Sequence, residues 1–243
     1  MPRTELVVAL DFNDQDKATE LMDKLSGLPV IYKIGLELFL SADSHWLQSV
    51  ASSGTRLFID LKLHDIPNTV ASAMVRVAKL GAEFATVHLS GGSRMLDELA
   101  HRLQDALLTG EIITKPRILG VSVLTSFKEE EWVANVSHMA KLSGVRNIED
   151  SVMHFAALAS EHKGVQGMVC SPHEVEAIRA KYPTLYLMVP GIRPEGAESG
   201  DQSRVMTPAE AMAKGASAIV VGRPVTKSKD PRAVVEQILK DIS

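Results

Sequence analysis

Three charged residues interrupt an apolar stretch of the chain, Leu57–Leu63, and the polar turn that follows it. The apolar run has bulky side chains on both faces, which is typical of a strand in a parallel sheet covered by helices. Side chains alternate along a strand, so Asp60 and Lys62 are expected on the same face, with Asp65 just beyond them. An unpaired buried charge is very costly. The face is therefore either the solvent-filled mouth of a site or a charge network, and a structural Asp–Lys ion pair at a strand end remains an alternative.

Further polar residues follow other apolar runs of the chain. Asp11 ends the first run, Lys33 lies near the end of the second, and Thr125 follows the fifth. Any one of these could be an ordinary surface residue. Four alternating carboxylates and ammonium groups on three consecutive runs, however, favour a functional site. Structural ion-pair networks are the alternative, because they bring together the same kinds of group.

Two glycine–arginine segments follow the seventh and eighth apolar runs. Gly191-Ile192-Arg193 and Gly222-Arg223-Pro224 combine glycines, which let backbone N–H groups approach an oxyanion, with guanidinium groups that bind it bidentately. They predict a phosphate site, although turn glycines beside exposed arginines are the alternative. The polar, glycine-rich segment 194–204 suits a lid over a ligand, and an inert surface loop competes with that interpretation.

Eight apolar β runs separated by helical patterns must position these groups. The runs start at Leu6, Val30, Leu57, Phe84, Arg117, Gly167, Leu185 and Ala218. Eight alternations favour a single (β/α)8 TIM barrel spanning residues 1–243, with its active site at the C-terminal ends of the strands. Two capping boxes, Ser171–Glu174 and Thr207–Glu210, predict helices that begin at Pro172 and Pro208.

Composition narrows the function classes. The chain has 243 residues, 45% of them hydrophobic and 23% charged, which is ordinary for a globular protein. Its net charge of −4 argues against nonspecific binding of nucleic acid. The single cysteine, Cys170, excludes an internal disulfide and fits a reducing compartment. With no apolar run long enough to span a bilayer and no signal-type N-terminus, we expect a soluble, cytoplasmic protein.

Common cofactor and metal motifs are missing from the sequence. No Gly-x-Gly-x-x-Gly segment follows the first run, and no His-Glu-x-x-His pattern is present. Carboxylates at strand ends could bind Mg²⁺, but Lys33 and Lys62 would compete with the cation electrostatically. We therefore expect neither a metal nor a cofactor.

The chain resembles the orotidine 5′-phosphate decarboxylase family, in its compact bacterial form. The resemblance extends over the whole chain and centres on the motif Asp60-x-Lys62-x-x-Asp65-Ile66-Pro67-Asn68-Thr69. Other matching segments are Val8–Asp11, Lys33–Gly35, Val87–Gly92, Val123–Ser126, Pro190–Pro194, Gly200–Gln202 and Gly222–Thr226. The family implies cofactor-free decarboxylation of orotidylate to UMP and CO₂ by a homodimer.

The resemblance also implies a role for each site residue. Lys62 is the expected proton donor to C6 of the pyrimidine, Asp60 lies by the departing carboxylate, and Lys33 orients Asp60 and contacts the ribose. Asp65 and Thr69 are expected to reach the neighbouring subunit's site. The remaining expected contacts are Asp11 with ribose hydroxyls, Thr125 with the pyrimidine, Gln202 with base and phosphate, and Arg193, Gly222 and Arg223 with phosphate.

Two rival functions remain open at the level of sequence. The motif from Asp60 to Thr69, taken alone, also fits a Mg²⁺- or cofactor-dependent enzyme of the same superfamily that acts on a sugar phosphate. A catalytically silent barrel that senses or sequesters a nucleotide is the second rival, although the intact Lys–Asp set argues against it.

Overall fold

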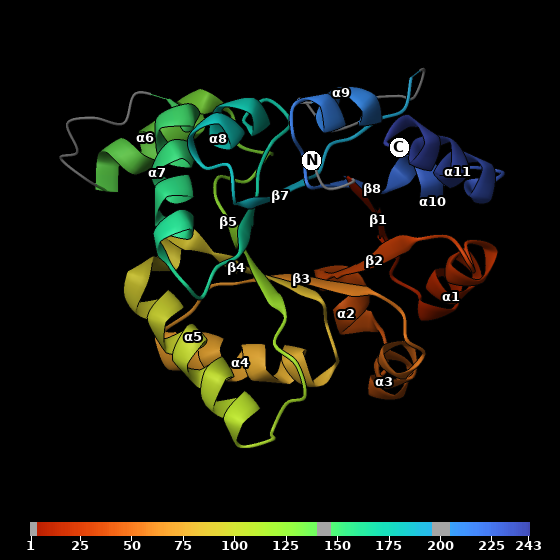
Figure 1. Cartoon of the computed structure of the whole chain (residues 1–243), viewed down its shortest axis with the longest axis horizontal. Coiled ribbons are helices and arrows are strands. Elements are labelled where there is room, and N and C mark those ends of the chain that lie inside the picture. The colour runs from red at the N-terminus through yellow and green to blue at the C-terminus, as the bar shows by residue number, and fades with distance from the viewer. Residues whose placement is uncertain (1–3, 140–146, 196–204) are drawn as a thin grey trace.

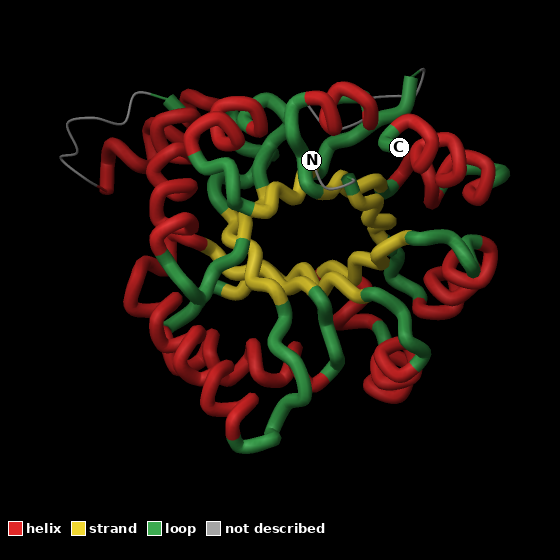
Figure 2. Tube along the Cα trace, viewed as in Figure 1, coloured by secondary structure: helices red, strands yellow, loops and turns green. Residues whose placement is uncertain are grey.

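Eight parallel strands close into a barrel in the order β1 to β8, as the computed structural model of the chain shows. The structure describes residues 4–139, 147–195 and 205–243. Neighbouring strands pair in sequence order, and β1 pairs with β8 to close the ring (Figure 2). The strands are β1 Glu5–Ala9, β2 Val30–Gly35, β3 Leu57–Leu63, β4 Phe84–His88, β5 Arg117–Val121, β6 Gly167–Val169, β7 Tyr186–Val189 and β8 Ala218–Val221. The predicted TIM barrel is confirmed.

Helices surround the ring of strands, as Figure 1 shows. They are α1 Gln15–Lys24, α2 Leu36–Ser41, α3 Ser44–Ser52, α4 Pro67–Lys79, η1 Leu89–Gly91, α5 Gly92–Leu108, α6 Glu129–Met139, α7 Ile148–Glu161, α8 Val175–Lys181, α9 Pro208–Ala213, α10 Arg223–Thr226 and α11 Pro231–Asp241. Within the described ranges, none of these helices is both long and apolar enough to cross a lipid bilayer.

The alternation of side chains along the strands produces two apolar cores. Leu6 and Val8 point outward into the large cluster between sheet and helices, whereas Val7 and Ala9 point into the barrel. The interior cluster also contains Phe58 of β3, whose ring packs edge-on against another interior ring. Side chains therefore fill the lower barrel, and polar groups collect above them at the carboxyl ends of the strands.

One of the two predicted capping boxes forms as expected. The Thr207 hydroxyl accepts from the backbone N–H of Glu210, whose carboxylate accepts from the backbone N–H of Thr207, and α9 begins at Pro208. The prediction for Pro172 was wrong, because α8 begins only at Val175. Glu174 does accept from the backbone N–H of Ser171, but residues 172–174 form a turn, so the hydrogen bond closes that turn instead of a helix.

Candidate active site

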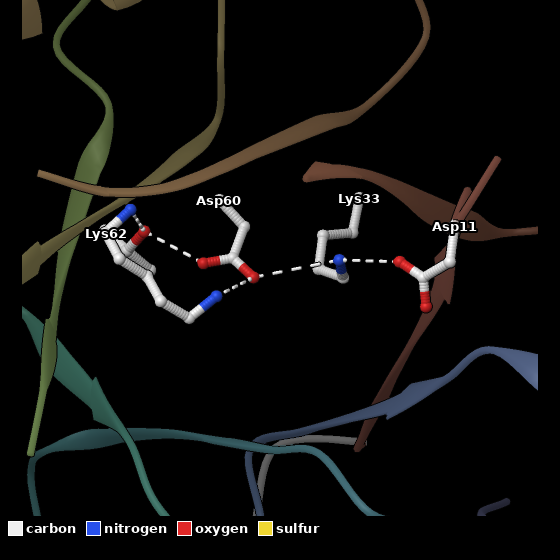
Figure 3. A network of polar contacts seen from close by, with 5 residues as sticks. Asp11, Lys33, Asp60 and Lys62 are labelled. Atoms are coloured by element: carbon white, nitrogen blue, oxygen red, sulfur yellow. Dashed lines mark hydrogen bonds and ion pairs between the residues drawn. The ribbon is translucent and has the colours of Figure 1, made fainter. Parts of the chain in front are cut away.

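Four charged side chains form a continuous row along one side of the barrel mouth, shown in Figure 3. Lys33 on β2 places its Nζ 3.1 Å from Oδ1 of Asp11, which follows β1, and 3.7 Å from Oδ2 of Asp60 on β3. The same Oδ2 atom lies 2.9 Å from Nζ of Lys62. The order of charges is thus negative, positive, negative, positive, and every neighbouring pair attracts.

Burial differs sharply along this row of charges. The Asp11 side chain is 53% exposed and that of Lys62 34%, whereas Lys33 and Asp60 are 13% and 10% exposed. Asp60 therefore sits in the least solvated position, between two ammonium groups. Burial raises the pKa of Asp60, but Lys62, Lys33 and the Thr86 hydroxyl lower it by more, so the pKa lies below its ordinary value of 3.8. Asp60 is ionised at neutral pH.

An irregularity in β3 determines where Lys62 lies. The β3–β4 pairing shifts register between Ile59 and Leu63. Lys62 lies inside this shift, and its backbone φ of +50° is left-handed, which is uncommon for a residue other than glycine. Lys62 does lie beside Asp60 as predicted, but the strict alternation of an extended strand is not the reason.

A cavity of about 490 Å³ opens above the barrel interior beside these charges. Asp11, Lys33, Asp60 and Lys62 line one part of it, and Thr125 beyond β5 lines another. Apolar side chains from β5, β6 and β7, such as Val121, Val169 and Met188, also line it. The cavity thus combines a charged wall with an apolar one, a composition that suits a small-molecule site.

The predicted phosphate residues line the same cavity. Gly191 and Arg193 follow β7, and Gly222 and Arg223 follow β8. Gly191 has a φ of +83°, which favours glycine. At Gly222 a Cβ atom would come within 2.9 Å of Oδ2 of Asp11, so only glycine leaves that carboxylate in place. The loops after strands seven and eight are a frequent phosphate site in such barrels.

Asp65 and Thr69 lie outside this cavity in the single chain. Both residues are exposed. Oδ1 of Asp65 accepts a 2.6 Å hydrogen bond from the backbone N–H of Ile66, and within the described part of the chain the carboxylate forms no ion pair. Gln202 falls outside the described residues.

Sequence reasoning missed three residues of this site. Thr86, on β4, donates a hydrogen bond to Asp60, and its position among interior residues of a strand was the available signal. Thr226 and Lys227 also line the cavity; Thr226 ends the matching segment Gly222–Thr226, but neither residue was assigned a role. Lys227 adds a third cation to those of Arg193 and Arg223, and its closeness in sequence to Arg223 could have indicated it.

Two other side chains in this region, His88 and Cys170, have shifted pKa values. The rings of His88 and His64 lie 5.3 Å apart, and burial, His64 and Lys62 together lower the pKa of His88. Cys170 lines the cavity but is buried, and burial raises the pKa of its thiol. A buried neutral thiol is a poor nucleophile. Among the residues that the structure describes, no group of three or more His, Cys, Asp or Glu side chains is arranged to hold a metal ion.

Comparisons with known proteins agree on one family. A family model described as "Orotidine 5′-phosphate decarboxylase / HUMPS family" matches residues 4–238. The orotidine 5′-phosphate decarboxylase of Paramagnetospirillum magneticum is 41% identical over 237 residues, with 97% of each chain covered. That of Moorella thermoacetica is 40% identical over 244 residues, covering 99% of this chain and 92% of the relative.

Solved structures show the same similarity in three dimensions. The orotidine 5′-phosphate decarboxylase structure from Lactobacillus acidophilus superimposes with a TM-score of 0.83 at 34% identity and covers 99% of both chains. The one from Pyrococcus horikoshii has a TM-score of 0.72 at 21% identity and covers 98% of both, which supports the shared fold alone.

Proposed function

The chain belongs to the orotidine 5′-phosphate decarboxylase / HUMPS family, and we propose that its barrel-mouth charges decarboxylate orotidine 5′-phosphate with Lys62 as the proton donor. The reaction converts orotidine 5′-phosphate to UMP and CO₂, the last step of UMP synthesis. The observation that supports this proposal best is the position of Lys62: its ammonium is 2.9 Å from a buried carboxylate and lines a cavity that also contains Arg193 and Arg223.

The substrate's phosphate and pyrimidine belong at opposite sides of the cavity. The arginines and glycines after β7 and β8 provide the anion site. Asp11 and Lys33 lie between that site and Asp60, where the ribose hydroxyls would meet them. The pyrimidine ring then lies toward Thr125, with C6 facing Lys62. Gln202 is proposed to contact base and phosphate on the strength of the sequence resemblance alone.

Decarboxylation breaks the bond between C6 and the carboxylate carbon. CO₂ leaves, and the electron pair stays on C6 in an orbital that no adjacent π system can delocalise. A proton from the Lys62 ammonium then forms the new C6–H bond, and solvent returns a proton to Lys62. Without a cofactor as an electron sink, the protein itself must stabilise the carbanion.

Repulsion of the substrate by Asp60 is too weak to supply most of the catalysis. Asp60 would lie beside the departing carboxylate, and two such charges 4 Å apart repel by about 4 kcal/mol at an effective dielectric of about 20. Enzymes lower barriers by about 8–23 kcal/mol, and difficult reactions need the upper part of that range. The Lys62 ammonium, held in place before the reaction, is therefore the larger contribution, because it faces the charge that develops on C6.

Asp65 and Thr69 are proposed to complete the neighbouring site in a homodimer. Both are exposed and lie outside their own chain's cavity. Ile66, between Asp65 and Pro67, exposes 67% of its surface, and Leu36 and Leu40 after the adjacent strand β2 are also exposed. Exposed apolar side chains such as Ile66, next to Asp65 in the sequence, fit a surface that a second copy of the chain covers. The single decarboxylase domain over 1–243 and the cytoplasmic location remain predictions.

The test follows the loss of orotidylate's ultraviolet absorbance with purified, EDTA-treated protein. We expect rapid loss with the wild type and almost none with Lys62→Ala. Lys79→Ala is the matched control, because Lys79 is similarly exposed and also pairs with a carboxylate, Glu111, but lies on α4 away from the mouth. A folded wild type without activity would overturn the proposal and direct the search to sugar phosphates with Mg²⁺. Full activity in Lys62→Ala would remove Lys62 as the proton donor.

A further inference from the structure

Thr86 lies where β3 departs from regular pairing with β4. Ile59 pairs with Ala85 and Leu63 pairs with Val87, so three residues of β3 face a single residue of β4. That single residue is Thr86, which is 1% exposed. Its side chain is therefore enclosed against the two residues that carry the charges, Asp60 and Lys62.

The Thr86 hydroxyl joins these two residues through two hydrogen bonds. It donates to Oδ1 of Asp60 at 3.0 Å and accepts from the backbone N–H of Lys62 at 2.9 Å. The backbone N–H of Lys62 can only donate, so the Thr86 oxygen accepts from it. The single hydrogen of the hydroxyl is then donated to the Asp60 carboxylate. Oδ2 of Asp60 is then left for the two ammonium groups.

The contact with the Lys62 backbone has a second consequence. Lys62 holds a left-handed φ of +50°, a strained conformation for a residue other than glycine that persists only when surrounding contacts enforce it. The regular β3–β4 ladder is interrupted here, and the Thr86 hydroxyl takes the N–H that the ladder would otherwise bind. One buried hydroxyl thus restrains both the carboxylate of Asp60 and the backbone from which the Lys62 ammonium extends.

We propose that Thr86 is a positioning residue for the decarboxylation: its hydroxyl fixes Asp60 and Lys62 relative to each other, so that the ammonium meets C6. This inference rests on the proposed function. Thr86 itself is not among the residues that line the cavity, so it acts through its two neighbours. A displacement of about 1 Å in such a constellation can cost on the order of 100-fold in rate.

A set of substitutions separates the hydroxyl from the packing of the side chain. Thr86→Val keeps the shape and removes both hydrogen bonds, whereas Thr86→Ser keeps the hydroxyl and removes the methyl group. Thr4→Val is the matched control, because Thr4 is also buried and its hydroxyl also makes a hydrogen bond, to the carbonyl of Ala216, but at the opposite end of the barrel. If Thr86→Val does not fold, Thr86→Cys replaces it, since a thiol is similar in size to the serine hydroxyl but a weak hydrogen-bonding group.

Steady-state kinetics with orotidylate give the first readout. We expect kcat to fall about 10- to 100-fold in Thr86→Val, with KM changed by less than about threefold, because the phosphate contacts are remote. Thr86→Ser should stay within about threefold of wild-type kcat, and Thr4→Val should match the wild type. A kcat within about twofold of wild type for Thr86→Val, or for Thr86→Cys where it replaces Thr86→Val, would overturn the inference. Thr86→Ser as slow as that variant would overturn it too.

Hydrogen exchange at the Lys62 amide gives a readout that does not depend on activity. The amide should exchange faster in Thr86→Val than in the wild type or in Thr86→Ser, because it loses its acceptor. Wild-type protein that does not turn over orotidylate would refute the proposed function. Equal exchange of the amide in Thr86→Val and the wild type would refute the positioning role, whatever the activity.

Discussion

Replacing Asp60 by Asn removes the central negative charge and leaves the shape of the site intact. The amide oxygen can still accept from Thr86, but Lys62 and Lys33 lose a carboxylate at 2.9 and 3.7 Å. At an effective dielectric of about 20 these two attractions amount to about 6 and 4 kcal/mol before desolvation is subtracted. Breaking a buried ion pair by removing one partner typically costs 3–5 kcal/mol. We therefore expect Asp60→Asn to lower the free energy of unfolding by about 3–5 kcal/mol at pH 7.

The pH dependence of this loss follows from the pKa of Asp60. That pKa is lowered in the folded protein, so the unfolded chain binds more protons between the folded pKa and the ordinary value of 3.8. The stabilisation by Asp60 is thus fully present above the unfolded pKa and is lost as the pH falls through the folded pKa. The difference between wild type and Asp60→Asn should be equal at about pH 7 and pH 5, and should shrink below about pH 4.

Urea unfolding, followed by the fluorescence of Trp46 and Trp132, measures these differences at one fixed protein concentration. Asp11→Asn is the matched control: it also removes a carboxylate from Lys33, at 3.1 Å, but Asp11 is more than half exposed. An exposed pair contributes about 0–1 kcal/mol, so we expect a loss of less than about 1 kcal/mol there. An Asp60→Asn variant as stable as the wild type at pH 7 would refute the reasoning. It would mean that the cost of burying these charges equals their attraction.

Two further predictions concern the substrate and the dimer. Orotidine without phosphate should lose turnover at saturation as well as affinity, because binding energy from a remote group is used in the transition state; equal kcat for orotidine and orotidylate would contradict this. Mixing inactive Lys62→Ala and Asp65→Ala subunits should restore roughly a quarter of wild-type activity, since half of the dimers are hybrids and one of the two sites in each hybrid carries neither defect. No recovery despite demonstrated subunit exchange would mean that Asp65 serves its own chain's site or none.

The barrel could be predicted from sequence because its signal is local and repeated. Each strand of a parallel sheet covered on both faces is an apolar run bounded by polar residues, so runs such as Val30–Gly35 and Phe84–His88 appear at the observed positions. Short helices gave no comparable signal. Helix α2, Leu36–Ser41, follows β2 with no intervening residue, and its sequence continues the apolar character of the strand.

Site residues at strand ends were predictable for the same reason, whereas the residue that positions them, Thr86, was not. Asp11, Lys33 and Asp60 stand out because charge follows an apolar run. Thr86 does not, because a threonine inside a strand is common in any β structure. Its importance depends on the register shift between β3 and β4, which involves two segments 24 residues apart in the chain. A pattern with period two along one strand contains no information about that shift.

Burial along the four charges is greatest in the middle of the row, at Lys33 and Asp60. Asp11, the most exposed group, lies on the side of β1, and Asp60 is enclosed between Lys33 and Lys62. The Lys62 side chain lines the cavity and is still about a third exposed, so a bound substrate would cover the ammonium that we propose as the proton donor to C6. Removing that water lowers the local dielectric and strengthens the attraction between the ammonium and the developing carbanion. In the proposed mechanism, the ammonium therefore acts most strongly when the cavity is filled, and a charge so close to solvent can then make the largest contribution.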